Sequence, residues 1–154
     1  MEPSILGGMD FNLDTDFKEI PLIPEGTYTG VVSKVEYDQE KVAIAWEFTL
    51  TNNGGLLPDS QVPIDGQKVF LRNWLPKPGD DNVPTASGKG NKRDSKIYSL
   101  GIFAKSMKID MGTKEKIAAG ISSGEWINKM VRLTVTHREY EGKVYTDVKK
   151  ASAI

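Results

Sequence analysis

The chain has 154 residues, of which 38% are hydrophobic and 27% are charged, and it contains no cysteine. This length suits one compact domain with an appended segment, and the lack of cysteine excludes disulfides, thiolate metal sites and cysteine nucleophiles. No apolar run approaches the roughly 20 residues of a membrane-spanning helix. We therefore expect no membrane association and a cytoplasmic location, in the host cytoplasm if the protein is viral.

The net charge of −1 hides two halves of opposite sign. Residues 1–65 hold 12 acidic and 3 basic side chains, whereas residues 66–154 hold 9 acidic and 17 basic ones. A basic half indicates a polyanionic partner or shielding by the acidic half. Two solvated surfaces that segregate along the chain would give the same counts.

The chain opens with an acidic stretch that has no clean periodicity. Residues 1–23 carry five acidic positions among isolated apolar ones. We predict an extended acidic arm, with one helical turn, that lies on the domain after it. Pro24–Glu25–Gly26 is a turn signal, and we place the main domain at residues 24–154.

Two strands are predicted at the start of this domain. Residues 27–37 are rich in Thr, Val and Tyr, and Gly30 within them indicates a bulge or bend of the kind that closes a barrel. Residues 41–51 alternate apolar and polar side chains, which is typical of a half-buried strand. Trp46 and Phe48 share its apolar face, so we expect both rings in the core.

The remaining elements are a third strand, a loop, a helical insert and a hairpin. The third strand spans 67–75. Residues 76–96 contain three prolines and are predicted to form a loop. A loop of this length is uncommon in a compact domain and is often functional. Helical spacing and strand alternation then predict helices over 95–108 and 114–121, and strands over 127–137 and 143–149. Five strands with a helical insert between strands 3 and 4 is the order of the OB barrel. We predict a mainly β fold of this type.

The third strand carries the most informative pattern, because its side chains alternate between two faces. The inner set is Val69, Leu71, Asn73 and Leu75. The outer set is Lys68, Phe70, Arg72 and Trp74. A row that alternates cations and aromatic rings can stack bases and neutralise phosphates together. Alternatively, the two rings pack under the helix or the acidic arm.

Further cations and rings follow this strand. Those in the predicted loop are Lys77, Lys89, Lys92, Arg93 and Lys96. Those on the last two strands and the turn between them are Arg132, Arg138, Tyr140, Lys143 and Tyr145. Flexible cations can follow a phosphate backbone, and the loop between strands 4 and 5 of an OB barrel borders its binding cleft. Each of these side chains is equally consistent with a solvated surface.

Catalysis is not expected from this sequence. His137 is the single histidine, and a lone histidine on a strand is usually structural. The aspartate pairs at 14–16 and 80–81 lack His or Glu partners at metal-ligand spacing. We predict a protein that is not an enzyme and needs no metal or cofactor.

Three short segments frame the predicted strands. They are Pro24-Glu25-Gly26-Thr27-Tyr28, Gly66-Gln67-Lys68-Val69-Phe70 and Tyr140-Glu141-Gly142-Lys143-Val144-Tyr145-Thr146-Asp147-Val148-Lys149. Together they resemble bacteriophage single-stranded DNA-binding proteins of the OB-fold type, over residues 24–150. The resemblance implies sequence-independent binding of single-stranded DNA in viral replication or recombination, with replication or recombination proteins as partners. Many such proteins end in an acidic tail, whereas residues 149–154 here contain no acid.

Two other classes of protein compete with this interpretation. One is a virion structural or protein-interaction barrel that binds no nucleic acid, and the other is a nuclease that uses the scattered aspartates. RNA is also an open alternative to DNA, because stacking and phosphate contacts serve both polymers.

Overall fold

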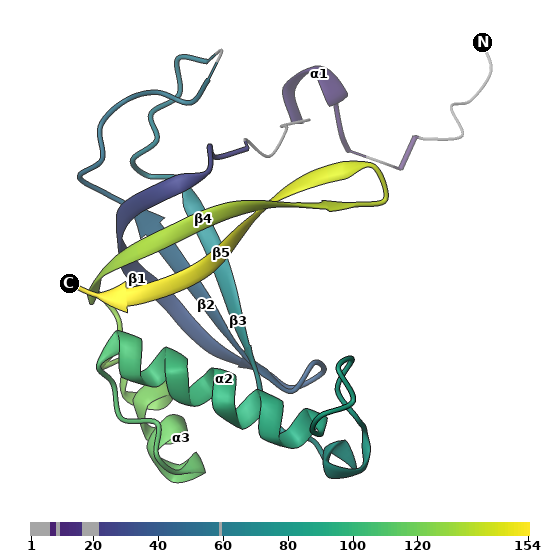
Figure 1. Cartoon of the computed structure of the whole chain (residues 1–154). Coiled ribbons are helices and arrows are strands. Elements are labelled where there is room, and N and C mark those ends of the chain that lie inside the picture. The colour runs from purple at the N-terminus through teal and green to yellow at the C-terminus, as the bar shows by residue number, and fades with distance from the viewer. Residues whose placement is uncertain (1–6, 9, 17–21, 59) are drawn as a thin grey trace.

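The computed structural model describes residues 7–8, 10–16, 22–58 and 60–154 (Figure 1). Its main element is an antiparallel sheet of five strands in the order β3-β2-β1-β4-β5. The strands are β1 (Gly26–Asp38), β2 (Ala43–Leu50), β3 (Lys68–Trp74), β4 (Met130–Tyr140) and β5 (Lys143–Ala153). Two helices, α2 (Lys92–Met107) and α3 (Lys114–Ser123), lie between β3 and β4. The mainly β composition and the helical insert are therefore confirmed.

The sheet curls on itself, but hydrogen bonds do not close it. β3 and β5 are its two edges, yet some of their Cα atoms lie within 8 Å of one another. Figure 1 shows β4 and β5 crossing in front of β1, β2 and β3, with α2 and α3 at one end of the sheet. The architecture is barrel-like, and its assignment to the OB fold stays a prediction.

The bends of the sheet do not lie where the sequence indicates. The pairing register shifts between Val32 and Lys34 in β1, so the bulge lies beyond Gly30. Gly30 serves a close approach of strands instead, because a Cβ there would lie 3.0 Å from a Leu133 methyl and 3.0 Å from the Thr49 carbonyl oxygen. A glycine inside a strand is explained here by crowding from both neighbouring strands.

Trp46 lies at the centre of the core. Its ring centroid is 5.1 Å from that of Phe103, 5.5 Å from that of Trp126 and 6.2 Å from that of Phe48. Its indole N–H donates a 2.6 Å hydrogen bond to Oδ1 of Asn73 on β3. Trp46 and Phe48 are 1% and 0% exposed, which confirms the predicted core face of β2.

α2 begins earlier than the sequence predicts. Asn91 caps the helix by accepting a 2.8 Å hydrogen bond from the backbone N–H of Asp94. The helix therefore starts at Lys92, and the final residues of the predicted loop over 76–96 are helical. The loop itself contains a short 3-10 helix, η1 (Asp80–Asn82). The sequence pattern missed this cap because Asn91 follows a glycine-rich stretch that reads as loop.

The acidic arm joins the main domain at Ile23. Its described part contains one helical turn, α1 (Leu13–Asp16), as predicted. Ile23 is 2% exposed, its backbone N–H donates to Oγ1 of Thr146 at 3.3 Å, and its carbonyl oxygen lies 2.6 Å from Nε2 of His137. The end of the arm thus packs on β4 and β5. The predicted acidic positions Glu2 and Glu19 lie outside the described residues.

Gly120 of α3 faces the indole of Trp126 so closely that a Cβ would overlap the ring. We expect Gly120→Ala to lower the free energy of unfolding by about 1–3 kcal/mol, because overpacking outweighs the better helix propensity of alanine. In α2, nothing lies within 4 Å of a Cβ at Gly101. Gly101→Ala is therefore the matched control, and we expect it to raise stability by about 0.5–1 kcal/mol. Urea unfolding measures both, and equal effects would contradict this packing.

Candidate nucleic-acid interface

β3 presents its aromatic side chains to solvent. Phe70 is 63% exposed and Trp74 is 48% exposed, whereas Val69 and Asn73 on the opposite face are 2% and 8% exposed. The predicted alternation of this strand is therefore present in the structure. Neither α2 nor the described part of the arm buries the two rings, so they remain available as a stacking surface.

The cations between these rings already have acidic neighbours. Nζ of Lys68 lies 3.5 Å from Oε2 of Glu47, and Nη2 of Arg72 lies 3.9 Å from Oδ2 of Asp38. The Arg72 guanidinium also lies 5.8 Å from the centroid of the Trp74 ring. Ion pairs this exposed contribute about 0–1 kcal/mol, so a phosphate group can replace the carboxylate at little cost. The face is less positive than the strand sequence alone suggests.

Lys96 fastens the loop after β3 onto α2. Its Nζ donates a 2.7 Å hydrogen bond to Oδ2 of Asp80, and the same oxygen accepts a 2.7 Å hydrogen bond from the backbone N–H of Lys77. These bonds, that from Lys96 first, lower the pKa of the Asp80 carboxyl. The sequence predicts a phosphate contact for Lys96, whereas the structure pairs its charge with Asp80.

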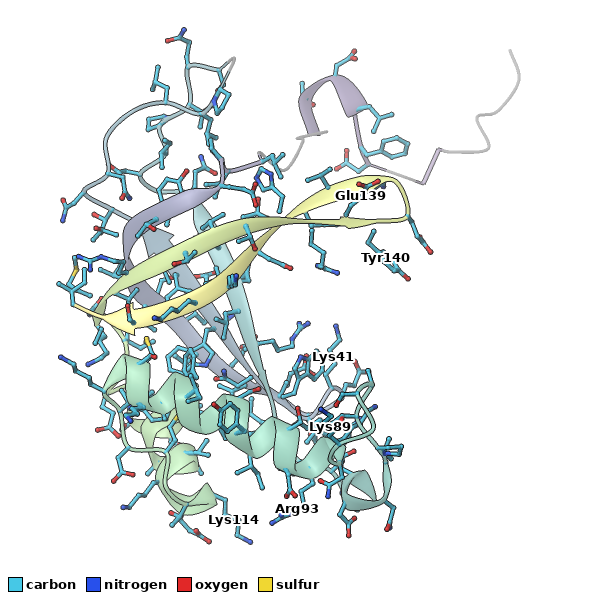
Figure 2. All side chains as sticks on the ribbon, in the orientation of Figure 1. Lys41, Lys89, Arg93, Lys114, Glu139 and Tyr140 are labelled. Atoms are coloured by element: carbon cyan, nitrogen blue, oxygen red, sulfur yellow. The ribbon has the colours of Figure 1, made fainter. Side chains whose placement is uncertain are left out.

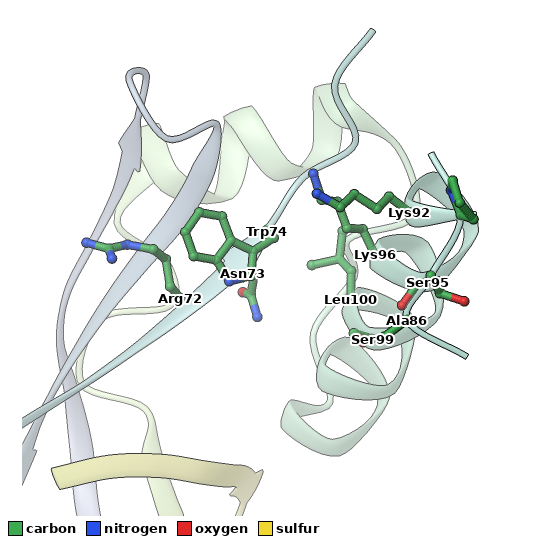
Figure 3. Close-up of a pocket in the computed structure, with 11 residues that line it drawn as sticks. Arg72, Asn73, Trp74, Ala86, Lys92, Ser95, Lys96, Ser99 and Leu100 are labelled. Atoms are coloured by element: carbon green, nitrogen blue, oxygen red, sulfur yellow. The ribbon is translucent and has the colours of Figure 1, made fainter. Parts of the chain in front are cut away.

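A pocket of about 380 Å³ opens between β3 and the N-terminal half of α2 (Figure 3). Four residues of the predicted site line it, namely Arg72, Trp74, Lys92 and Lys96. The fold thus brings together side chains that are about 20 residues apart in the sequence. The volume lies at the small end of the range of about 300–1,000 Å³ that is typical of ligand sites.

The hairpin residues form a second group. Nε of Arg138 donates a 2.9 Å hydrogen bond to Oδ2 of Asp147, and its guanidinium lies 5.5 Å from the centroid of the Tyr145 ring. Tyr140 is 58% exposed at the end of β4. In Figure 2 Tyr140 and Lys89 project from separate parts of the molecule. An extended polymer can contact both, whereas a single nucleotide cannot.

The remaining predicted cations are exposed at scattered positions. Arg93 pairs with its neighbour Asp94 at 3.2 Å, and Arg132 lies on β4, whose hydrogen-bonded neighbours are β1 and β5 rather than β3. Five of the predicted site cations are exposed and have no ion pair among the described residues, namely Lys77, Lys89, Lys92, Arg132 and Lys143. The structure therefore collects part of the predicted set around β3 and leaves the rest apart.

Asn73 is the site residue that sequence reasoning did not single out. The signal was present, because a polar residue on the inner face of a predicted strand must find hydrogen-bond partners. Its partner, the indole N–H of Trp46, lies on another strand and could not be identified from local pattern.

The part of the chain that the structure describes contains no group of three or more His, Cys, Asp or Glu side chains that could hold a metal ion. None of its helices is long and apolar enough to cross a membrane.

Comparison of the sequence with protein-family models and with curated proteins finds no match. The function is therefore inferred from the geometry of the site.

The ion pair between Asp80 and Lys96 predicts a specific acid response. The pKa of Asp80 is lower in the folded protein than in the unfolded chain. Its stabilising contribution is thus complete above the ordinary value of about 3.9 and is lost as the pH falls through the lower folded value. Between about pH 4 and pH 2, we expect the free energy of unfolding to fall less steeply in Asp80→Asn than in the wild type.

Urea unfolding at a series of pH values measures this slope. Asp81→Asn is the matched control, because Asp81 is exposed and its carboxylate has no hydrogen bond or ion pair among the residues described. If the free energy of unfolding falls as steeply with decreasing pH in Asp80→Asn as in the wild type, the carboxylate does not fasten the loop.

Proposed function

We propose that this protein binds single-stranded DNA through a barrel of the OB type, by stacking bases and neutralising phosphates, and acts in viral DNA replication or recombination. The exposure of Phe70 and Trp74 on one face of β3 carries the proposal. Four residues apart, they lie roughly 13 Å apart along the strand, so each ring can take a separate base. Stacking on aromatic rings tolerates any base, which suits binding without sequence specificity.

The charges around β3 support the same function. Lys68 and Arg72 stand beside the rings and exchange weak carboxylate partners for phosphates. Lys92, at the start of α2, has no ion pair among the described residues and lines the adjacent pocket. A phosphate backbone that follows β3 therefore meets cations on both sides of the stacked bases.

The topology is also consistent with an OB barrel. The sheet has five antiparallel strands, β1 pairs with both β2 and β4, and the helical insert follows β3. In OB barrels the surface of strands 2 and 3 and the flanking loops bind oligonucleotides. The exposed rings of this chain lie on the corresponding strand.

A second candidate function has one observation in its favour. An apolar groove of about 970 Å³ lies between α2, α3 and the turn after β1, and Ile97 and Ile117 are among the residues that line it. Such a groove suits a protein-interaction barrel that binds no nucleic acid. Binding to partners without any affinity for DNA or RNA would favour this candidate.

Removing either exposed ring of β3 should weaken DNA binding. We expect Phe70→Ala and Trp74→Ala each to lose about 1–3 kcal/mol, which is roughly a 5- to 150-fold increase in Kd for oligo-dT. Fluorescence anisotropy with a labelled oligonucleotide measures the loss. Tyr98→Ala is the matched control, because that ring is 71% exposed on α2 and does not line the pocket beside β3. Unchanged affinity in both β3 variants would refute the stacking surface.

Tryptophan fluorescence should report binding through one residue. Trp74 is 48% exposed, whereas Trp46 and Trp126 are 1% and 6% exposed. We expect oligo-dT to quench the tryptophan fluorescence of the wild type. Trp74→Phe should lose this quenching while a mobility shift persists.

The affinity for oligo-dT should depend on salt. The logarithm of Kd should rise linearly with the logarithm of the salt concentration, and Lys68→Ala should reduce the slope by about 0.7 for one lost phosphate contact. Matched RNA and duplex DNA distinguish the polymers, and binding that does not respond to salt would contradict the phosphate contacts.

A further inference from the structure

The pocket between β3 and α2 contains the side-chain amide of Asn73, whose orientation is fixed by a hydrogen bond on the side away from the pocket. Asn73 lines this pocket and is only 8% exposed. Its Oδ1 accepts the 2.6 Å hydrogen bond from the indole N–H of Trp46. An indole nitrogen can only donate, so this bond identifies which atom of the amide is oxygen. The NH2 group of Asn73 therefore points away from the indole of Trp46.

This NH2 group has no acceptor among the residues that the structure describes. In the same residues, no fully enclosed side-chain nitrogen or oxygen lacks a hydrogen-bond partner. The nitrogen of Asn73 is therefore not sealed in the core and reaches the space of the pocket. A donor this deeply set and this firmly oriented is suited to one acceptor atom of a ligand.

The other walls supply groups of complementary chemistry. Figure 3 shows Asn73 on β3 across from Ser95 and Ser99 of α2, which are one helical turn apart and can donate or accept. Lys96 also lines the pocket, but its charge is neutralised by Asp80 at 2.7 Å. Lys92 lies on the same wall without an ion pair among the described residues. Asn73 and the hydroxyls around it can hydrogen-bond the carbonyl oxygens of a ring, while the cations of the lining can pair with a phosphate of the same strand.

We propose that this pocket takes one pyrimidine base of the bound strand, thymine best, and that Asn73 donates to a carbonyl oxygen on its edge. The proposal rests on the proposed function, since the strand that stacks on β3 must deliver the base. Trp74 and Arg72 belong both to the outer face of β3 and to the lining of the pocket, so one strand can occupy the two surfaces together.

The engaged oxygen of Asn73 explains the choice of base. Asparagine usually reads adenine with its oxygen and nitrogen together, as acceptor and donor. Here Oδ1 accepts from the indole of Trp46 and is turned toward the core, so the NH2 group is the part of the amide that faces the pocket. Thymine offers two carbonyl oxygens and no exocyclic amine.

The test compares the affinities of the full chain for oligo-dT and oligo-dA of equal length. Asn73→Asp keeps an oxygen for Trp46 and replaces the donor, so we expect the dT-to-dA affinity ratio to fall about five-fold or more. The ratio cancels the general repulsion between the added charge and phosphate. Ser99→Leu fills the pocket from α2, where the side chain is exposed, and should lower the ratio similarly without disturbing the core.

Ser122→Leu, an exposed serine of α3 outside this pocket, is the matched control and should keep the wild-type ratio. In the wild type, oligo-dT should also shift the side-chain NH2 resonance of Asn73, which Asn73→Asp identifies by its loss. If Ser99→Leu keeps the wild-type dT-to-dA affinity ratio and the Asn73 resonance does not move, the proposed base pocket is wrong, but the proposed binding of the strand still stands. No binding of any oligonucleotide by the wild type would overturn the proposed function and the pocket together.

Discussion

The side chain of Trp46 joins three parts of the chain that are far apart in the sequence. From β2 it packs on Phe103 of α2 and on Trp126 beyond α3, and it donates a hydrogen bond to Asn73 of β3. A buried indole has a large apolar surface and a single polar atom, so its packing and its hydrogen bond together restrict how these elements can be arranged. The helical insert is held against the end of the sheet by this cluster, and the position of α2 relative to β3 follows from it.

That position gives the two faces of β3 different environments. The inner face contributes Val69 and Asn73 to the core and to the wall of the pocket, while the outer face leaves Phe70 and Trp74 in contact with solvent. Large rings exposed on one face of a strand form a surface that a binding partner can cover. On our two proposals, a single strand therefore carries both a sequence-tolerant stacking surface and the group that reads one base.

Ion pairs with nearby carboxylates determine which cations around β3 are available to a ligand. Glu47 and Asp38 stand beside Lys68 and Arg72, and Asp80 holds Lys96. Exposed pairs are weak, so on the proposed function they exchange with phosphate, whereas the more buried pair of Asp80 and Lys96 fastens a loop. The basic half of the chain is thus divided into cations available to a polyanion and cations committed to the fold.

The sequence by itself determined the strands, the helical insert, the core face of β2 and the two faces of β3, because strand alternation and helical spacing are local properties of the chain. The tertiary structure decided where β1 bulges, why Gly30 is needed, which cations are already paired and where the pocket opens. Those features depend on partners distant in sequence, such as Trp46 with Asn73 and Asp80 with Lys96. Such partners cannot be predicted from the residues that neighbour a side chain along the sequence.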